Sequence, residues 1–427
     1  MQIPDVPPQL LSALVEAAAG QRLALVGGVV RDLLLYRHHQ DPWRGLPDLD
    51  LVVEGRAADL VERLPQALEH HLGVPVPLRQ QPHGRYGTVA VELQLPPEQG
   101  GTWLLDLASA RQEEYSTPGD NPQVSPGSLE LDLARRDLTV NSMALVLPRG
   151  GASEPQLLDP YGGQQDLAAR QLRFLHPHSL RDDPTRLLRA ARYAARLGFG
   201  LAPDALQQAA STLEAWPWPW RPGDPPQLAP PALATRLRME LELLLEREPW
   251  RQALADLQAC GGLMLLDSAL QADHRWRWRL VWAGRLGVPP LLALITGAAD
   301  PLGLAQRLQL PHGQQVQLRQ WLALRQALAR LEEGGSPRPD RPSAWCAFLE
   351  QPGFSPQAVV LALLTGVQPR RPLLRWWLAW RHVRSPQDGL ALMREGWAPG
   401  EALGSEMRRR RSELLDGSVS VEGSVQA

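Results

Sequence analysis

Two aspartates separated by one residue offer a clear opportunity for chemistry in this sequence. Asp48 and Asp50 stand at the start of an apolar run that continues to Val53. Residues i and i+2 of a strand point to the same face of a sheet, so these carboxylates would lie side by side. Neighbouring carboxylates repel each other, but both become favourable when they hold Mg²⁺, a hard cation that takes oxygen ligands. The pair therefore predicts a metal site, which in a two-metal form can activate a hydroxyl and stabilise a leaving pyrophosphate.

A third carboxylate and a preceding proline bear on this prediction. Asp106 lies in the apolar run Trp103–Leu107 and is a candidate third catalytic carboxylate beside Asp48 and Asp50. A cap at the end of a strand is an equally good interpretation of Asp106. Pro47 precedes the pair, and an isolated Asp-x-Asp sequence is more often a solvated turn.

A pair of glycines lies just upstream of the aspartates. Gly27 and Gly28 follow the apolar run Arg22–Val26 and precede a helical stretch, Val29–Tyr36. Glycine allows a ligand to approach the backbone closely, and the free amides at a helix N-terminus attract phosphate. Arg31, one turn into the helix, could add a charge-assisted contact to a triphosphate. Alone, such a pair is more often a tight turn, but here it lies next to the aspartate strand.

A charged helix begins in the middle of the chain at Asp183. Arg186, Arg189 and Arg192 follow at intervals of three residues, so the four side chains form one slowly drifting stripe. Three arginines in one stripe repel one another, which implies an anionic partner. The alternative interpretation is a charged face in solvent.

The surrounding elements indicate two kinds of architecture. Up to about residue 150, short apolar runs alternate with helical segments, which is typical of an α/β or α+β domain. From about Leu167 helical spacing dominates, interrupted by the proline-rich segment Trp216–Pro231, which we interpret as a linker or extended loop. The predicted strands are Arg22–Val26, Leu49–Val53, Gly87–Leu93 and Trp103–Leu107, and the clearest later helices are Asp183–Leu197 and Thr235–Glu246.

Composition narrows the class of protein. The chain has 427 residues and a formal net charge of −2, so any nucleic-acid surface must be a local patch. All 44 basic residues are arginine, and the two cysteines and ten histidines show no metal-ligand spacing. The N-terminus lacks the pattern of a signal peptide, and no apolar run is long enough to cross a membrane. We therefore expect a cytoplasmic protein without a membrane partner.

Four ordered motifs in the first half of the chain resemble those of one family. GGVVRDLLL followed by DLDLVVEG resembles motif A of the tRNA nucleotidyltransferase and poly(A) polymerase family, in the class II (bacterial-type) group of polymerase-β-like nucleotidyltransferases. RRDLTVNSMA, from Arg135 to Ala144, resembles RRDxTxNxxA. DPYGGQQDL, which begins at Asp159, resembles DPxGGxxDL, and DDPTRLLRAAR, which begins at Asp182, resembles EDxxRxxRxxR. Four motifs in the same order form a specific signal.

The resemblance implies roles for residues of the first two motifs. Arg136 would hold the incoming nucleotide, and Asp137 would accept a hydrogen bond from the ribose 2′-hydroxyl, which helps to select ribonucleotides. Arg135 and Asn141 would support them. The triphosphate contacts implied by the first motif are Gly27, Gly28 and Arg31, and the Mg²⁺ ligands are Asp48 and Asp50.

The helix of the fourth motif would read the base. In the family it supplies a base-reading pair, here Asp183 and Arg186, and Arg189 and Arg192 continue the same stripe as further nucleotide-binding candidates. A carboxylate can accept from the exocyclic amine of C or A, whereas G and U present a carbonyl that a carboxylate repels. The family usually has Glu where this sequence has Asp182, so the supporting role of that position is not carried over.

The resemblance also implies the architecture and the reaction. We expect an α+β fold with a polymerase-β-like nucleotidyltransferase head (residues 1–150), an all-helical neck with the nucleotide-reading helix (residues 151–215), and a helical body and tail that bind tRNA (residues 216–427). The reaction would be template-independent transfer of CMP and/or AMP from CTP or ATP to the tRNA 3′ end, with Mg²⁺ as cofactor and pyrophosphate as product. No DNA partner is expected.

Two other functions and one question of specificity stay open. A poly(A) polymerase of the same family usually carries a long basic C-terminal extension, whereas the tail of this sequence is short and only locally basic, which favours tRNA as the substrate. A non-catalytic RNA-binding module is the other alternative, against which Asp48, Asp50 and Arg136 argue. The segment Tyr115–Gly127 falls where the family has a loop that matters for adding A. Because this segment is not obviously truncated, it favours competence for A.

Overall fold

The computed structural model describes residues 3–46, 48–83, 87–97, 100–148, 154–228, 230–334 and 337–422. Contacts within the chain divide it into two compact units. Unit 1 comprises Met1–Arg221 and Pro230–Leu265, and unit 2 comprises Pro222–Ala229 and Leu266–Ala427. The limits proposed above for head, neck and body stay predictions.

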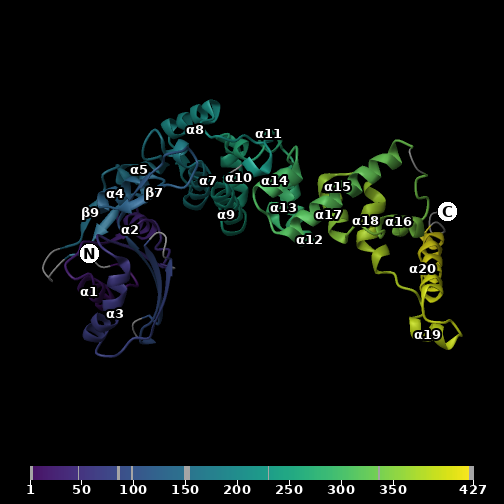
Figure 1. Ribbon diagram of the computed structural model, residues 1–427, viewed down its shortest axis with the longest axis horizontal. Coiled ribbons are helices and arrows are strands. Elements are labelled where there is room, and N and C mark those ends of the chain that lie inside the picture. The colour runs from purple at the N-terminus through teal and green to yellow at the C-terminus, as the bar shows by residue number, and fades with distance from the viewer. Residues whose placement is uncertain are drawn as a thin grey trace. The chain divides into compact units, whose positions relative to one another are not determined.

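A seven-stranded mixed sheet forms the centre of the N-terminal part of unit 1 (Figure 1). Its strands lie in the order β3-β4-β5-β2-β1-β8-β9, and β2 pairs in parallel with β5 while the other neighbours are antiparallel. The central strands are rich in buried Leu and Val, as expected of strands covered on both faces. The strands are β1 (Leu23–Val26), β2 (Leu49–Val53), β3 (Leu78–His83), β4 (Thr88–Gln94), β5 (Thr102–Ser109), β8 (Ala144–Val146) and β9 (Gln156–Leu158).

The parallel pairing of β2 with β5 sets the position of the acidic residues. The register places Asp50 opposite Asp106, and residues directly opposite each other share a face of the sheet. Asp48 directly precedes β2, two residues before Asp50. All four predicted strands are confirmed as β1, β2, β4 and β5; β2 has the predicted bounds, and the ends of the other three differ by at most two residues.

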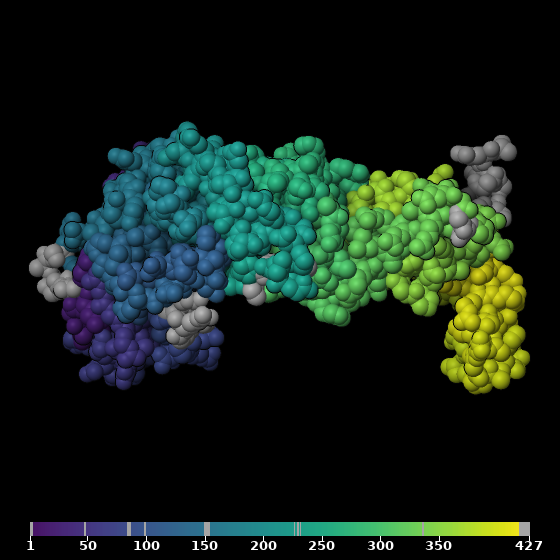
Figure 2. All heavy atoms as spheres, turned by 45° about the horizontal axis from the view of Figure 1, so that its top comes forward, coloured from purple at the N-terminus to yellow at the C-terminus, as the bar shows by residue number. Residues whose placement is uncertain are grey.

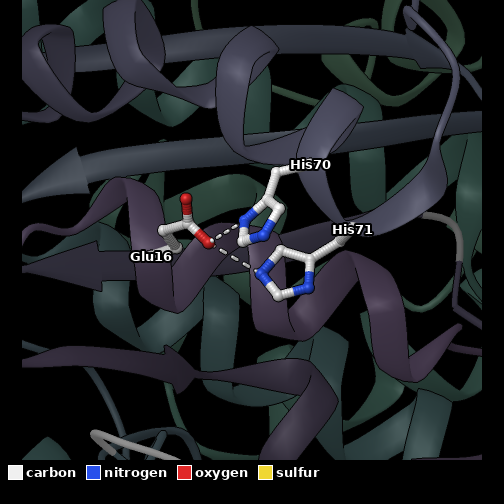
Figure 3. Close-up of side chains that lie close together, drawn as sticks. All are labelled: Glu16, His70 and His71. Carbon is white, nitrogen blue, oxygen red and sulfur yellow. Dashed lines mark hydrogen bonds and ion pairs between the residues drawn. The ribbon is translucent and has the colours of Figure 1, made fainter.

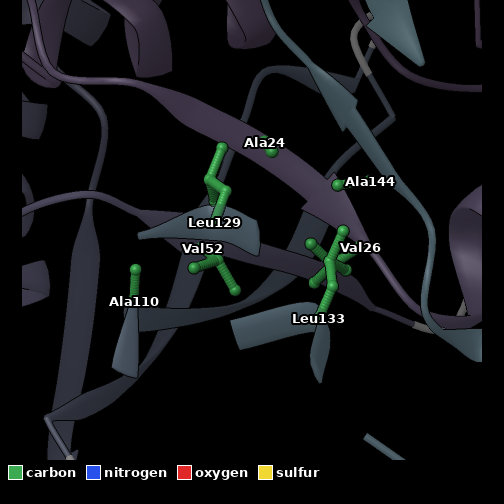
Figure 4. Packing of buried hydrophobic residues seen from close by; sticks show 7 residues of the cluster. All are labelled: Ala24, Val26, Val52, Ala110, Leu129, Leu133 and Ala144. Carbon is green, nitrogen blue, oxygen red and sulfur yellow. The ribbon is translucent and has the colours of Figure 1, made fainter. Parts of the chain in front are cut away.

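The face of the sheet that carries Asp50 also carries a small apolar core. Val52, two residues after Asp50, shares its face and packs against Leu129 and Leu133 of α4 (Leu129–Ala134). This packing fixes the C-terminal end of α4, where the RRD motif begins. The core cluster shown in Figure 4 comprises Ala24, Val26, Val52, Ala110, Leu129, Leu133 and Ala144.

Two further helices pack together beside the sheet. α1 (Pro8–Ala17) lies against α3 (Ala57–Leu72), and α3 also contacts β4 and β5 (Figure 1). Buried leucines recur along α3 with helical spacing, including Leu60, Leu64 and Leu68, so one face of the helix is apolar. Such a face is stable only when it is covered, which explains why α3 lies between α1 and the sheet.

Several short strands were not predicted. β6 (Arg111–Glu114) and β7 (Gln123–Pro126) form an antiparallel pair, so the end of the segment predicted as a loop is a strand. β10 (Gln171–Leu172) and β11 (Gly200–Leu201) form a two-residue parallel pair. The residues of β7 are exposed throughout, and a strand without apolar alternation gives little signal in a sequence.

The second half of unit 1 is built on helices. α7 (Thr185–Leu197) packs against α9 (Pro231–Arg247) and α10 (Trp250–Ala259), and the helices predicted at 183–197 and 235–246 are confirmed. The helix predicted at 29–36 is also confirmed, as α2. The remaining helices of unit 1 are α2 (Gly28–His38), α5 (Gly163–Ala169), α6 (Ser179–Asp182) and α8 (Pro203–Ala215).

The start of the proline-rich segment packs into unit 1. Trp216, Trp218 and Trp220 are at most 8% exposed, and Trp216 Nε1 donates to the carbonyl of Trp220. The intervening prolines prevent helical hydrogen bonding, while the indoles supply apolar surface. The segment is therefore an extended loop over these residues, and the interpretation as a linker is wrong for them.

Unit 2 contains helices and no strand among its described residues. In its core, α15 packs on α17 with buried Leu318, Trp321 and Leu324. Figure 2 shows α19 and α20, in yellow, as a lobe that projects from the rest of unit 2. Among the described residues of the whole chain, none of the helices combines the length and apolar character needed to cross a membrane. The helices of unit 2 are α11 (Ser268–Gln271), α12 (Trp276–Leu286), α13 (Pro290–Ile295), α14 (Pro301–Arg307), α15 (His312–Glu332), α16 (Pro342–Leu349), α17 (Pro356–Thr365), α18 (Arg370–Leu378), α19 (Gly389–Arg394) and α20 (Glu401–Glu422).

Candidate active site

Three carboxylates from neighbouring strands form a compact cluster. Asp48 directly precedes β2, Asp50 lies in β2 and Asp106 lies in β5. One ligand atom from each lies within 4.8 Å of the others. The structure thus brings together the three acidic residues that the sequence indicated. Three carboxylates supply the oxygen ligands that a hard divalent cation such as Mg²⁺ prefers.

Burial and mutual repulsion make the cluster electrostatically unfavourable by itself. Burial, reinforced by the charges of Asp48 and Asp106, raises the pKa of Asp50 to about 6, and Arg136 offsets only part of this effect. Burial and the charge of Asp106 also raise the pKa of Asp48. A cation between the carboxylates would relieve the repulsion, so the electrostatics of the cluster fit a divalent metal.

The glycine turn between β1 and α2 brings the backbone close to the cluster. Gly27 has φ of +69°, and a Cβ there would lie 3.2 Å from Arg136 Nη1 and 3.6 Å from Asp50 Oδ2. Glycine is therefore required both for its conformation and for space. Gly28 is the first residue of α2, so the free amides of that helix begin at this point.

Two arginines at the end of α4 are held by one buried carboxylate. Asp132 is 1% exposed, and its Oδ1 accepts from Arg135 Nε and Nη2 at 2.9 and 2.6 Å. Its Oδ2 accepts from Arg136 Nη2 at 3.0 Å. Because both guanidinium groups are fixed in advance, they would lose little conformational freedom on binding an anion. This role of Asp132 was not predicted, although Asp132 precedes the two arginines by three and four residues, a spacing that brings side chains together on a helix.

Asp137 is a buried, ionised acceptor. Its Oδ2 accepts from Arg189 Nε at 2.7 Å, and its Oδ1 accepts from the amide of Leu138 at 2.8 Å and from Asn141 Nδ2 at 3.2 Å. Burial alone would raise the pKa of Asp137, but the Arg189 ion pair and these hydrogen bonds lower it to about 2. A carboxylate has about four acceptor positions, so one remains for a ligand hydroxyl.

Arg31 contacts Asn141, a hydrogen-bond partner of Asp137, and does not face the cavity. It is 3% exposed, and its Nη1 donates to Asn141 Oδ1 at 2.9 Å while Nε and Nη2 donate to Asp32 at 2.8 and 2.9 Å. It is not among the residues that line the cavity described below. Its visible role is to orient Asn141, and the direct triphosphate contact of Arg31 stays a prediction.

The two candidate base-reading residues are both held in place. Asp183 Oδ1 accepts from the amide and the hydroxyl of Thr185 at 3.0 and 2.7 Å, at the start of α7. Arg186 is 4% exposed and donates to the carbonyls of Arg135 and Ser179 at 2.8 and 3.4 Å. The first of these bonds joins the reading helix directly to the RRD motif.

The rest of the arginine stripe meets carboxylates of the protein itself. Arg189 Nη1 donates to Glu240 Oε1 at 2.9 Å, and Arg192 donates to Glu240 and Glu248 at 3.0 and 3.1 Å. The anionic partner that the arginine stripe implies is therefore, in part, a pair of glutamates of the protein itself, Glu240 and Glu248. Arg189 also lines the cavity, whereas Arg192 is 5% exposed and does not, so a nucleotide contact by Arg192 stays a prediction.

These groups surround one cavity of about 380 Å³ within unit 1. Asp50 is the member of the carboxylate cluster that lines it, so the cluster and the cavity meet at this residue. The positive residues of the wall are Arg135, Arg136, Arg186, Arg189 and Arg236. The acidic residues are Asp50, Glu113, Asp137, Asp183 and Glu240, and the others are Gly27, Gly28, Tyr115, Asn141, Thr185, Tyr193 and Met239.

Arg236 of α9 is a cavity residue that was not predicted from the sequence. Its Nη1 donates to Asn121 Oδ1 and its Nη2 to the carbonyl of Gly119, both at 3.0 Å, and its Nε lies 3.8 Å from Asp183 Oδ2. Arg236 therefore joins the segment 115–127 to the reading helix. The helix predicted at 235–246 carries several charged residues, and the sequence did not show which of them would face the cavity.

The third motif supports the site without lining the cavity. Asp166 Oδ2 accepts from Thr139 Oγ1 at 2.6 Å, and a Cβ on Gly163 would lie 2.5 Å from the carbonyl of Thr139. Thr139 begins the single 3₁₀ turn that carries Asn141. The motif thus keeps this turn close to α5.

Comparison with known proteins places the chain in a family. Residues 23–173 match a family model described as the poly A polymerase head domain. The CC-adding tRNA nucleotidyltransferase of Deinococcus radiodurans is 38% identical over 302 residues, which cover 69% of this chain and 68% of that enzyme. The chain belongs to the tRNA nucleotidyltransferase family. The A-adding tRNA nucleotidyltransferase of Halalkalibacterium halodurans is 39% identical over 199 residues, which cover 45% of this chain and 40% of that enzyme.

Solved structures of tRNA nucleotidyltransferases share the fold. An apo form of a CCA-adding enzyme aligns with a TM-score of 0.69 over 97% of this chain and 96% of that chain, at 23% identity. The Thermotoga maritima CCA-adding enzyme complexed with tRNA aligns with a TM-score of 0.65 over 98% of this chain and 96% of that chain, at 22% identity. The expected α+β fold, with a polymerase-β-like head followed by helices, is therefore confirmed.

Proposed function

We propose that this tRNA nucleotidyltransferase adds CMP and/or AMP to the tRNA 3′ end without a template, from CTP or ATP, with release of pyrophosphate. The observation that carries the proposal is the junction at Asp50, where the carboxylate cluster meets the arginine-walled cavity. The cluster suits a divalent cation and the arginines suit a triphosphate. The relatives are a CC-adding tRNA nucleotidyltransferase, A-adding tRNA nucleotidyltransferases and multifunctional CCA proteins, and this range of relatives supports the same reaction.

The donor set favours Mg²⁺ as the cation. Asp48 and Asp50 would hold it, and Asp106 offers a third carboxylate within reach. Mg²⁺ prefers oxygen ligands and usually binds one or two carboxylates together with substrate phosphates. When bound, it would supply charge neutralisation of the triphosphate and acidity to the attacking hydroxyl.

The side chains of this chain would orient the reactants. In the reaction, the oxygen of the RNA 3′-hydroxyl bonds to the α-phosphorus, the bond from that phosphorus to the bridging oxygen breaks, and pyrophosphate leaves. Arg136, fixed by Asp132, would donate to the triphosphate, and such fixed donors stabilise charge as it develops. Asp137 would accept from the ribose 2′-hydroxyl at its remaining acceptor position.

Base choice would follow from Asp183 and Arg186. Thr185 fixes Asp183 through Oδ1, which leaves Oδ2 to accept from the exocyclic amine of C or A. Arg186, anchored on the carbonyl of Arg135, would donate to a ring acceptor of the same base. A carbonyl of G or U facing Oδ2 would be repelled, so GTP and UTP would be poor substrates.

Two observations bear on whether the chain adds C, A or both. The CC-adding relative aligns over 69% of this chain, whereas the A-adding relatives align over 42 to 45% of it. The segment 115–127, by contrast, is present and linked to the reading helix through Arg236, which favours competence for A. We keep both nucleotides in the proposal for this reason.

An incorporation assay tests the proposal against its alternatives. With Mg²⁺, the full chain should add CMP or AMP to tRNA transcripts that lack part of CCA, and release one pyrophosphate for each nucleotide added. No incorporation on any transcript would leave a non-catalytic RNA-binding module, and long runs of A added to unrelated RNA would identify a poly(A) polymerase. Because tRNA is the expected substrate, we also expect a cytoplasmic location.

A further inference from the structure

A second group of metal-ligand side chains lies in unit 1, outside the active-site cavity. Glu16 at the end of α1 meets His70 and His71 near the end of α3 (Figure 3). His70 Nδ1 and His71 Nε2 each lie 2.9 Å from Glu16 Oε2. We propose that these three residues form a binding site for a divalent transition-metal ion such as Zn²⁺, which joins α1 to α3.

The ligand types select this class of metal. Two imidazole nitrogens and one carboxylate oxygen suit Zn²⁺ and its first-row neighbours, whereas Mg²⁺ prefers oxygen ligands alone. Zinc–ligand bonds of about 2.0 to 2.1 Å place the ligand atoms of a tetrahedral ion about 3.3 Å apart. The two nitrogen–oxygen separations are 2.9 Å, the length of a hydrogen bond. Each would lengthen by about 0.4 Å to admit an ion, which small side-chain rotations can provide.

Solvent can reach all three ligands. The side chains of Glu16, His70 and His71 are 45%, 69% and 29% exposed, so an ion can enter and keep water at its remaining positions. A site with three protein ligands and open positions differs from a closed structural zinc site with four. The proposal therefore assigns binding and cross-linking to this group, not catalysis.

The backbone that carries the ligands is fixed independently of any ion. Leu10 and Leu14 of α1 and Leu64 of α3 are fully buried where the two helices pack. Arg63 Nε also donates to the carbonyl of Ala17, at the end of α1, at 2.7 Å. Because the helices are already held together, binding requires only side-chain adjustment and should add to the stability of unit 1.

This site could not be predicted from the sequence. Two consecutive histidines do not have the i, i+4 spacing of a helical metal motif, and their carboxylate partner is 54 residues away from His70. The interpretation that the ten histidines contain no metal set is therefore replaced by this proposal for two of them.

Zinc titration of the full chain tests the site. The titration should be done in millimolar Mg²⁺ on an Asp48→Asn/Asp50→Asn background, so that the acidic cluster of the active site does not contribute. We expect this parent to bind one more Zn²⁺ than a version that also carries Glu16→Gln, His70→Gln and His71→Gln. Each single change should weaken binding at least about tenfold, since even residues that only orient metal ligands contribute about 10–100-fold. His274→Gln, at an exposed histidine of unit 2, is the matched control and should change nothing.

Two further readouts separate a metal site from a hydrogen-bonded cluster. Co²⁺ should give a visible absorption band in the parent but not in the triple variant, and Zn²⁺ should raise the melting temperature of the parent alone. Circular dichroism would confirm that the variants are folded. Equal zinc stoichiometry and affinity in the parent and the triple variant, or no zinc binding by the parent, would overturn the proposal and leave Glu16 as a hydrogen-bond partner of two histidines.

Discussion

Asp50 joins the two parts of the active site. It belongs to the carboxylate cluster and lines the cavity, and its Oδ2 would lie 3.6 Å from a Cβ placed on Gly27. Burial and the charge of Asp48 raise its pKa to about 6. Without a cation, the folded state therefore holds Asp50 in an unfavourable charged form at neutral pH, and this is a direct consequence of a site that is ready for a metal.

The first prediction concerns stability without metal. The pKa of Asp50 rises from 3.8 to about 6 on folding, so the folded state binds the proton more tightly, and the associated stability is present below about pH 4 and lost as the pH rises through 6. Asp50→Asn cannot ionise, so in EDTA at pH 8 it should be more stable than the wild type, by up to about 3 kcal/mol. Denaturant unfolding at pH 8 and pH 4.5 measures this difference, which should shrink at the lower pH.

The same unfolding measurement with Mg²⁺ added completes this test. Mg²⁺ should stabilise the wild type at pH 8 and leave Asp50→Asn unchanged. Glu62→Gln, an exposed carboxylate of α3, serves as the control and should behave as the wild type. Equal metal-free stability of Asp50→Asn and the wild type at both pH values would mean that Asp50 is not under electrostatic strain.

The second prediction concerns base choice. Arg186→Ala should reduce discrimination against UTP and GTP by about 10–100-fold, because one bidentate base contact is worth about 1–3 kcal/mol. It should also slow the addition of both C and A. Ratios of kcat/KM for the four nucleotides measure the effect, with Arg181→Ala, exposed in the preceding helix α6, as the control. Wild-type rates together with unchanged rejection of UTP and GTP would show that Arg186 does not read the base.

Single residues differ in how well the sequence indicates their role. The role of Asp48 and Asp50 could be predicted from the two-residue periodicity of a strand, because that spacing alone brings the two carboxylates together. Arg31 and Arg192 have suitable types and positions, but buried partners occupy them: Asn141 for Arg31, and Glu240 for Arg192. Those partners lie 110 and 48 residues away in the sequence. Contacts between residues so far apart cannot be predicted without the fold.

Among the helices, α9 was not expected to contribute side chains to the active-site cavity. It contributes Arg236 and Glu240 to the cavity, and Arg236 holds the segment 115–127 while lying near Asp183. The amide of Gly119 also donates to the carbonyl of Asp182, so this contact does not depend on the side chain that differs from the family pattern. Strands β1, β2, β4 and β5 were predictable from apolar patterning. The short exposed strands and the docking of α9 were not, because both depend on tertiary contacts.

The third prediction follows from this link. Arg236→Ala removes two hydrogen bonds of 3.0 Å to Gly119 and Asn121, each worth about 1 kcal/mol, so amide exchange at residues 119–121 should become about 10–100-fold faster. The kcat/KM for nucleotide addition should fall as well, because the segment and Asp183 both lose a positioning contact. Glu246→Gln, exposed on the same helix, is the control. Unchanged exchange at residues 119–121 would show that Arg236 does not hold this segment.

On the scale of the whole molecule, charge is balanced overall and concentrated locally. The formal net charge is −2, yet all 44 basic residues are arginine. Some of these arginines form ion pairs with carboxylates of the protein itself, as Arg136, Arg189 and Arg192 do around the active site. In unit 2, Arg275 and Arg325 line another cavity, of about 180 Å³. Guanidinium groups suit phosphate, so we predict contacts with RNA phosphate groups at this cavity.

The fourth prediction is that tRNA affinity falls steeply with salt. Each phosphate neutralised by arginine adds about 0.9 to the slope of log affinity against log salt. Arg275→Ala and Arg325→Ala should each reduce that slope by about 1, whereas Arg330→Ala, exposed on the same helix as Arg325, should leave it unchanged. Filter binding between low and physiological salt measures the slope. A flat salt dependence in the wild type would exclude phosphate contacts as the main source of affinity.

The most direct test of the proposed function uses three tRNA transcripts, ending at the discriminator base, at C, and at CC, each offered CTP and ATP separately and together with Mg²⁺. A full CCA enzyme extends all three to CCA, a CC-adding enzyme stops at CC, and an A-adding enzyme extends only the transcript that ends in CC. The proposal predicts one of these three patterns for the wild type. Asp48→Ala and Asp50→Ala should bind the same transcripts but extend none, a loss of at least about 10³-fold if the metal supplies several kcal/mol. Failure of the wild type to extend any transcript, or near-normal extension by either aspartate variant, would contradict the assignment of nucleotide transfer to this site.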